Sequence, residues 1–203
     1  MVRKTKQAAL ATRSHILDTA ERVFEQRGVS GTSLAEIAKA AGLTRGAIYW
    51  HFDDKADLFN AMMERVRLPL EETRRSGKGG PAELTLAQMR NDLRAVLERV
   101  VADPQMRRVF GIATHKVEYV GETQGLRERH LSVRNECLAG IEHTLRRAIR
   151  RGELARRVPA RAAGIGLHAL LDGLLQNWML DPTGFDLVKV GTRALDTYLA
   201  GLA

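Results

Sequence analysis

A short segment around residue 45 carries side chains that could read a nucleic acid. Thr44 is a suitable N-cap for a helix over residues 44–51, and Arg45 would lie in the first turn of that helix. An arginine in this position can donate two hydrogen bonds to a guanine in the major groove of DNA. Gly46 has no side chain and lets the backbone come close to a partner, although it costs about 1 kcal/mol of helix propensity. Tyr49 would lie on the same exposed face.

A second short helix precedes this one at helix-turn-helix spacing. Ser33 and Glu36 form a capping box, in which each side chain accepts a hydrogen bond from the other residue's amide, and predict a helix over residues 33–41. Gly42 provides the tight turn between the two helices. The alternative is an ordinary αα-corner, whose polar residues are exposed to solvent and do not contact DNA. Trp50 has two interpretations, contact with the sugar–phosphate edge of DNA or cover for the small core of this domain.

Helical periodicity extends over nearly the whole chain, so we predict an all-α fold of about nine helices. Apolar residues recur at three- and four-residue spacing, and no segment alternates as a strand does. Glycine, proline and capping side chains mark the ends of the predicted helices. These markers are Gly28, Asp54 with Asp57, Pro69, Asp103-Pro104, Gly121 with Gly125, Gly152, Pro159 and Asp181-Pro182. We also predict a loop over residues 73–81 and a last helix over residues 184–201.

Length and composition narrow the class of protein. The 203 residues carry a formal net charge of +8 and have a pI near 10.1, which favours a polyanionic partner. The most apolar stretch, residues 165–180, contains polar and charged side chains, so we predict no membrane span. No apolar signal-peptide core follows the N-terminus, and the single cysteine, Cys137, argues against a disulfide framework or a cysteine-based zinc site. We expect a protein of the reducing cytoplasm, with no cofactor.

Two basic segments stand out from the rest of the chain. The first thirteen residues hold four basic and no acidic side chains, which predicts a flexible basic arm at residues 1–8. Residues 146–161 contain seven arginines and a single acidic residue, Glu153. We interpret this cluster mainly as a solvated helix end, with a nucleic-acid role as the alternative.

The run TSLAEIAKAAGLTRGAIYWHF at residues 32–52, followed by Lys55, resembles the DNA-binding domain of the TetR family. The opening residues and the run after Thr44 are especially similar to repressors of multidrug efflux pumps, of the AcrR and TtgR type. Two further stretches, 115–119 and 171–178, also match these repressors. The resemblance covers most of the chain and is most specific near the N-terminus.

The resemblance implies roles for individual positions. Residues 1–54 would form a three-helix DNA-binding domain with a helix-turn-helix, and residues 55–203 a helical ligand-binding and dimerisation domain. Arg45 would read bases with Thr44 and Gly46, while Tyr49, His51, Lys55 and either Thr32 or Ser33 would hold phosphates, with Trp50 beside them. The implied ligand-binding residues are Met63, Val66, Leu93, Val96, Leu97, Phe110, Thr114, Cys137, Ile141, His168, Leu171, Asp172 and Leu175.

The resemblance also implies partners. Two subunits would pair through helices over 160–180 and 184–201 and form a homodimer. The dimer would bind double-stranded, palindromic operator DNA and would be released from it by a small amphipathic or aromatic inducer. The apolar residues of 160–180 support the pairing independently, because they lie on more than one face of that helix.

Asp172 is the most informative residue of the second domain. It lies within the apolar helix over 160–180, where an unpaired carboxylate would be strongly unfavourable. It has either a local polar partner or a role as an anchor for ligands, as the resemblance implies. Arg67, Phe110 and Thr114 depart from the acidic or polar residues of related repressors, so we expect a different ligand set.

Other classes of function have less support in the sequence. The six histidines are dispersed, and we find no nucleophile–base series, phosphate-cradling glycine loop or metal-ligand spacing. We therefore expect no enzyme and no metal ligand at His51. A purely architectural DNA binder would not need a long helical domain behind the helix-turn-helix. A TetR-type repressor of a metabolic or stress operon is the remaining alternative. Cys137 is expected to be a buried thiol rather than an oxidation sensor.

Overall fold

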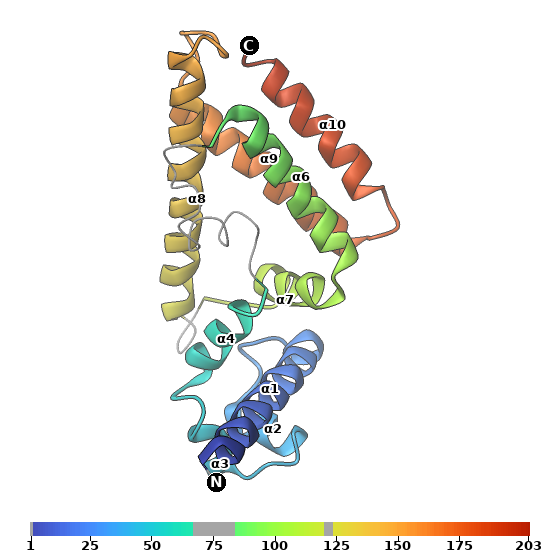
Figure 1. Cartoon of the computed structure of the whole chain (residues 1–203). Helices are drawn as coiled ribbons and strands as arrows, with labels where there is room; N and C mark the ends of the chain where they lie inside the picture. The colour runs from blue at the N-terminus through green and yellow to red at the C-terminus, as the bar shows by residue number, and fades with distance from the viewer. Residues whose placement is uncertain (1, 67–83, 120–123) are drawn as a thin grey trace. The chain divides into compact units, whose positions relative to one another are not determined.

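The computed structural model describes residues 2–66, 84–119 and 124–203, and nine α-helices account for most of these residues (Figure 1). No strand occurs in these three ranges, and the prediction of an all-α fold is confirmed. The helices form two compact units. The first unit comprises residues 1–66 with 108–129, and the second comprises residues 67–107 with 130–203.

The first unit begins with the long helix α1 (Val2–Arg27). This helix ends where Gly28 adopts a φ of +78°, a conformation that strains residues with a Cβ atom. Helix α1 already begins at Val2, so residues 2–8, where a flexible basic arm is predicted, are helical in the structure. Helix propagation from the following turns extends the helical conformation through this basic segment.

Three short helices follow, α2 (Leu34–Ala40), α3 (Arg45–Tyr49) and α4 (Lys55–Met63). Each begins at a side-chain cap, as predicted, because an N-terminal turn leaves backbone amides without an intrahelical acceptor. The caps are Ser33, Thr44 and Asp54, which accept hydrogen bonds from the amides of Glu36, Ala47 and Asp57. Apolar side chains from α1 and these helices form one core; Ile16, Phe24, Ile37, Ile48, Phe52 and Leu58 are all almost fully buried.

Helix α7 (Pro104–His115) contributes residues to both units. Asp103 caps it through Oδ1, which accepts hydrogen bonds from the amides of Gln105 and Met106, as the Asp-Pro pair predicted. Its residues from 108 onward belong to the first unit. There the chain after α7 meets the loop after α1, since the Val29 amide donates to the Lys116 carbonyl at 2.9 Å.

The second unit contains α6 (Leu86–Ala102), most of α8 (Gln124–Arg150), α9 (Ala160–Leu180) and α10 (Leu187–Ala200). Helix α10 packs against both α6 and α9 (Figure 1). The Tyr198 hydroxyl of α10 donates to the Ala163 carbonyl of α9 at 2.9 Å. No helix in the described ranges combines the length and apolarity that a membrane span requires.

Helix boundaries differ from the sequence prediction at a few places. The last helix begins at Leu187 rather than 184, because Asp186 caps it, and Phe185 therefore lies before the helix. Gly125 lies inside α8 instead of preceding it. Pro69, the loop over 73–81 and Gly121 lie outside the described residues.

The contact between α6 and α10 is close at Gly191. A Cβ atom added there would lie 2.7 Å from Cδ1 of Leu97, which is fully buried and has little room to move. We expect Gly191→Ala to lower the free energy of unfolding by about 1–3 kcal/mol, because overpacking outweighs the gain in helix propensity. Urea denaturation measures the change.

The matched control is Gly140→Ala in α8, where no heavy atom lies within 4 Å of the added Cβ. This variant should raise the free energy of unfolding by up to about 1 kcal/mol through helix propensity alone. Equal effects of the two substitutions would contradict the packing assigned to Gly191.

Candidate nucleic-acid interface

Helix α3 presents one polar face outward and is fixed from behind by one apolar residue. The hydroxyl oxygen of Thr44 accepts a hydrogen bond from the Ala47 amide at 3.2 Å, which starts the helix at Arg45. Ile48 is fully buried and anchors the inner face. The Arg45 guanidinium lies 5.5 Å from the centre of the Tyr49 ring, one turn along the helix. This cation–π contact orders the arginine while leaving its donors exposed.

Helix α2 begins at a capping box and is joined to α3 by a tight turn. The Glu36 carboxylate accepts hydrogen bonds from both the amide and the hydroxyl of Ser33 at 2.8 Å, and these bonds lower the pKa of Glu36. Gly42 adopts a φ of +68° in the turn, and the following amide of Leu43 donates to the Ala38 carbonyl at 2.9 Å. Together α2 and α3 form the predicted helix-turn-helix.

Trp50 and His51 extend this face beyond the end of α3. The Trp50 side chain is 73% exposed and meets the His51 ring edge-on, with the ring centres 4.6 Å apart. The alternative in which Trp50 covers the domain core is therefore wrong. Arg13 of α1, which the sequence analysis missed, lies over the Phe52 ring at 4.8 Å. Burial, with help from the Arg13 charge, lowers the pKa of His51, so its ring is a neutral hydrogen-bond donor at pH 7.

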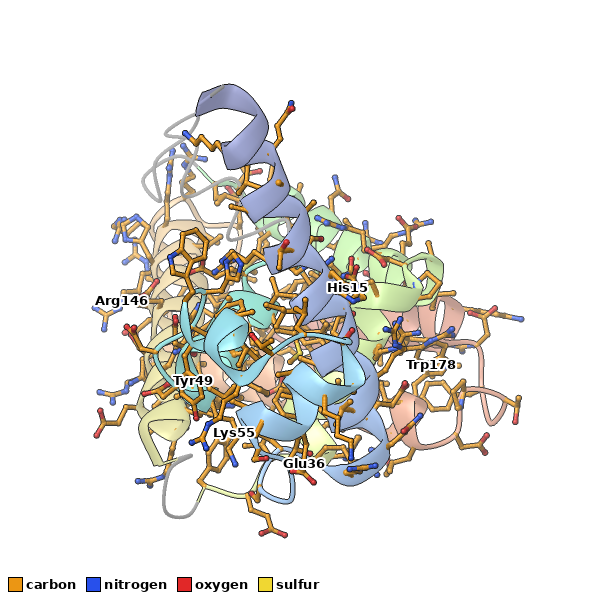
Figure 2. All side chains as sticks on the ribbon, turned by 90° about the horizontal axis from the view of Figure 1, so that it is seen from below. His15, Glu36, Tyr49, Lys55, Arg146 and Trp178 are labelled. Carbon is orange, nitrogen blue, oxygen red and sulfur yellow. The ribbon has the colours of Figure 1, made fainter. Side chains whose placement is uncertain are left out.

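Two of the predicted phosphate contacts are turned inward. Thr32 is 2% exposed and its hydroxyl donates to the Gly28 carbonyl at 2.8 Å, so only Ser33 of this pair is on the surface. Lys55 is 9% exposed, and its ammonium donates to the carbonyl of Thr32 at 3.0 Å. Lys55 therefore ties the start of α4 to the loop before α2. Tyr49, Glu36 and Lys55 can be followed in Figure 2.

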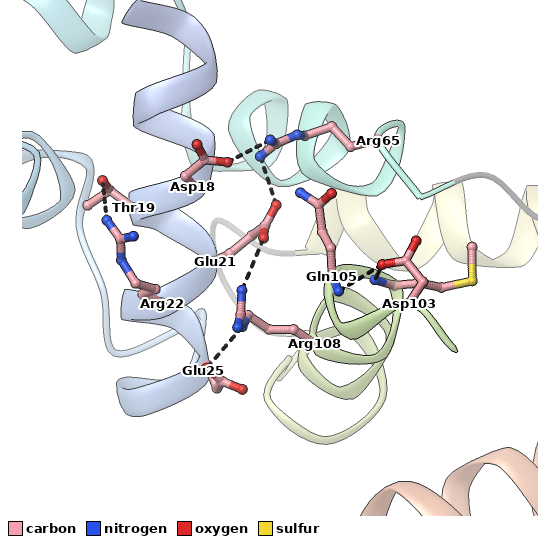
Figure 3. A network of polar contacts seen from close by, with 10 residues as sticks. Asp18, Thr19, Glu21, Arg22, Glu25, Arg65, Asp103, Gln105 and Arg108 are labelled. Atoms are coloured by element: carbon pink, nitrogen blue, oxygen red, sulfur yellow. Dashed lines mark hydrogen bonds and ion pairs between the residues drawn. The ribbon is translucent and has the colours of Figure 1, made fainter. Parts of the chain in front are cut away.

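A buried carboxylate on α1 joins this helix to α7 and to the turn just after α4, all within the first unit. The Glu21 side chain is 2% exposed and is paired with Arg65 at 2.9 Å and with Arg108 at 3.8 Å (Figure 3). Arg65 also contacts Asp18 at 2.6 Å, and Arg108 contacts Glu25 at 3.2 Å. The sequence analysis missed this network, although Glu21 stands among the apolar positions of α1 and could have signalled it.

Comparison with known proteins identifies the family. Residues 16–62 match the bacterial regulatory proteins of the tetR family, and residues 85–203 match the C-terminal region of MAATS-type transcriptional repressors. The chain is 38% identical to the HTH-type transcriptional regulator TtgR of Pseudomonas putida, over 98% of this chain and 95% of that protein. The chain belongs to the TetR family. It is a transcriptional regulator and not an enzyme.

Two solved structures resemble this TetR-family chain closely. The first is NalD, the secondary repressor of the MexAB-OprM multidrug efflux pump in Pseudomonas aeruginosa, with 34% identity, a TM-score of 0.84, and coverage of 95% of this chain and 97% of that one. The second is SmeT in complex with triclosan, with 33% identity, a TM-score of 0.80, and coverage of 94% and 91%. SmeT is the repressor of the Stenotrophomonas maltophilia multidrug efflux pump SmeDEF.

The predicted ligand-binding residues of this TetR-family regulator fall into both units. Met63, Val66, Phe110 and Thr114 belong to the first unit, and Leu93, Val96, Leu97, Cys137, Ile141, His168, Leu171, Asp172 and Leu175 belong to the second. The aliphatic members are mostly buried, whereas Thr114 is exposed. A surface hollow of about 510 Å³ lies along α10, and none of the predicted residues lines it.

Cys137 differs from its prediction. Its side chain is only partly buried on α8, so it is not the fully buried thiol that we expected. Among the described residues, no group of three histidine, cysteine or acidic side chains is placed to hold a metal ion.

Asp172 has a local partner on its own helix and basic neighbours on α8. Its Oδ2 lies 3.2 Å from Nδ1 of His168, and its side chain is 49% exposed. Burial raises the pKa of Asp172, and the charges of His168, His130 and Arg134 oppose this rise without cancelling it. The carboxylate is thus less stable in its ionised form than an ordinary surface aspartate.

Asp172→Asn should reveal the destabilisation that the ionised carboxylate of Asp172 causes. Because the pKa of Asp172 is raised in the folded protein, its ionisation lowers the free energy of unfolding as the pH rises through that pKa. The variant cannot ionise, so we expect it to be more stable than the wild type near neutral pH, with an advantage that shrinks as the pH falls towards the ordinary value of 3.8. Urea denaturation across this pH range tests the expectation. Asp53→Asn, at an exposed aspartate, should show no such trend.

Proposed function

We propose that this TetR-family chain is a ligand-responsive repressor, which binds a palindromic operator as a homodimer and controls a multidrug efflux pump operon. The observation that carries the proposal is the exposed face of α3, where a capped helix presents Arg45 beside Tyr49. The NalD and SmeT relatives, which repress efflux pumps, support the choice of operon. A metabolic or stress operon is the alternative. A protein with this function acts on DNA in the cytoplasm.

In this proposal each exposed residue of the interface has a distinct task. Arg45 reads guanine in the major groove, with Thr44 and Gly46 close to the same bases. The remaining exposed groups contact phosphates and fix the register of α3 on the duplex. These groups are Ser33, Tyr49, Trp50 and the neutral ring of His51, while Lys55 positions α4 from within.

The proposed dimer pairs α9 and α10 with the same helices of a second subunit. Three large apolar side chains of these helices remain in contact with solvent in the single chain. Ile165 is 48%, Leu180 69% and Val190 43% exposed. Pairing would remove this apolar surface from water. It would also place two α3 helices on successive major grooves, about 34–36 Å apart.

The proposed inducer is an amphipathic, aromatic-sized molecule bound by the predicted ligand residues. Leu93, Val96, Ile141 and Leu175 would bury its apolar surface, and Asp172 would orient its polar group. The carboxylate is suited to this task because burial keeps it from being fully solvated, so that a ligand donor improves its environment. The residues over 55–203 would then form the ligand-binding and dimerisation domain.

Operator selection from a random duplex pool, followed by footprinting, tests the repressor proposal. We expect a protected site with two-fold symmetry. Arg45→Ala should weaken binding to the selected duplex by about 1–3 kcal/mol and relax the base preference at one position in each half-site. Arg22→Ala removes the same charge from an exposed position on α1 and should leave base preference intact. A protected site without two-fold symmetry would rule out the dimeric arrangement.

Ligand and operator should weaken each other's binding by one common factor. A ligand shifts a two-state equilibrium only through its different affinities for the two states, so the coupling is reciprocal. Triclosan, which the SmeT relative binds, is a suitable first probe. Its affinity is measured by calorimetry with and without the selected duplex, and again in Asp172→Asn. Tight ligand binding that leaves the affinity for the operator unchanged would contradict the proposal that the ligand releases the protein from DNA.

A further inference from the structure

Most of the excess positive charge of this chain lies outside the helix-turn-helix. Residues 146–161, here called the arginine turn, contain seven arginines and one acidic residue, a net charge of +6 against +8 for the whole chain. Residues 1–66 contain ten basic and eight acidic residues, a net charge of only +2. The basicity of the chain is therefore not explained by the part that reads DNA.

The arginine turn is ordered by apolar residues and not by its arginines. It runs from the last turn of α8 to the first turn of α9. Leu154 and Ala160 are 4% and 9% exposed and anchor it, and the Ala155 amide donates to the Leu202 carbonyl. The arginines are displayed on this framework, and Arg147 is the only partly buried one among the seven.

Few of these arginines have acidic neighbours. Arg146 is paired with Glu142 at 2.6 Å, and Arg151 lies 3.9 Å from Glu153. The other exposed members have no ion pair within the described part of the chain; they are Arg150, Arg156, Arg157 and Arg161. Their donors are therefore available to an external anion.

The helix dipole explains the positions of only some of the arginines in the arginine turn. Arg147 and Arg150 lie in the last turn of α8, where cations are favoured by the carbonyl ends of the helix. Arg161 lies in the first turn of α9, where the helix dipole disfavours positive charge, and Arg156 and Arg157 precede the helix and lie at no helix C-terminus. Like charges spaced four residues apart also repel each other. The helix dipole therefore does not explain these three arginines, whereas a bound polyanion would offset their mutual repulsion.

We propose that the arginine turn is a second DNA-contact surface, which binds the phosphate backbone of a duplex without reading its sequence. Guanidinium groups bind phosphates with paired hydrogen bonds, which suits a cluster of arginines better than a diffuse charge. The segment contains no aromatic residue, so it cannot stack the bases of a single strand. None of its large apolar side chains is exposed, so it lacks the apolar anchor of a membrane-surface segment.

This surface would let the regulator hold a further duplex segment beside the one bound through α3. The arginine turn would act through counterion release, so its contribution should fall steeply as salt is raised. Binding of this kind increases the time that the protein spends on DNA near its operator. It adds nothing to base preference, because phosphate contacts carry no sequence information.

Duplex bridging by the full-length protein tests this proposal. A non-operator duplex of about three helical turns is immobilised and saturated with protein, and retention of a second, fluorescent copy is measured. We expect the wild type to retain the second duplex at low salt. Arg156→Gln with Arg157→Gln should reduce retention several-fold and lower the slope of log K against log salt by about 2, since each phosphate contact contributes about 0.9.

The matched control removes two arginines from exposed positions on α8 outside the turn, by Arg127→Gln with Arg134→Gln. It should retain the second duplex as the wild type does, when retention is compared at equal amounts of protein on the immobilised duplex. Absence of bridging, or an equal loss in both double variants, overturns the proposal. Capture of phosphatidylserine vesicles in place of duplex overturns it in favour of a membrane surface. None of these outcomes depends on operator selection, so the repressor proposal fails or stands separately.

Discussion

The buried carboxylate of Glu21 is the constraint on which the first unit depends. An ionised group that is 2% exposed is tolerated only when opposite charges and hydrogen bonds replace its water. Arg65, just after the end of α4, and Arg108 of α7 supply these charges, so three chain segments must keep one geometry around a single side chain. Removing either arginine would leave a buried charge poorly compensated, and breaking a buried pair of this kind costs about 3–5 kcal/mol.

This ion-pair network helps to explain how a helix as short as α3 can be stable. Helix α3 spans only Arg45–Tyr49, far below the length at which an isolated helix forms in water. Its stability comes from the Thr44 cap and from Ile48, which inserts into the core built on α1. Because Arg65 holds the segment just after α4 on α1, the C-terminal end of α4 is fixed against that core. The exposed side chains of α3 are therefore presented by a rigid support although their own helix is marginal.

Charge and recognition are separated along this chain. Residues 1–66, which contain the helix-turn-helix, are nearly neutral, with ten basic and eight acidic residues, and several of these form ion pairs within the first unit. Even Lys55, whose position suggests a phosphate contact, donates to backbone carbonyls. Non-specific attraction to a polyanion must come mainly from elsewhere, and the arginine turn carries the largest concentration of unpaired positive charge in the described chain. The base specificity of α3 and the non-specific affinity of the chain for DNA can then vary independently.

Local sequence alone determined where several of the helices begin. Ser33 with Glu36, Thr44, Asp54 and Asp103 all cap the helices that they were predicted to cap, because a cap is satisfied within one turn of chain. The outward face of α3 followed from the same short-range reasoning, since side-chain direction on a helix depends on spacing alone.

Only the tertiary structure decided which polar groups face inward. Thr32 and Lys55 look like surface residues in the sequence, yet both are buried. The Thr32 hydroxyl donates to the Gly28 carbonyl in its own loop, and the Lys55 ammonium donates to the Thr32 carbonyl, which lies 23 positions earlier in the chain. Trp50 looks suited to a core and is exposed, whereas its neighbours Ile48 and Phe52 are buried. Glu21 finds its partners 44 and 87 positions further along the chain. Hydrogen bonds and ion pairs between distant segments leave no periodic signal, so their geometry is known only once the helices have packed.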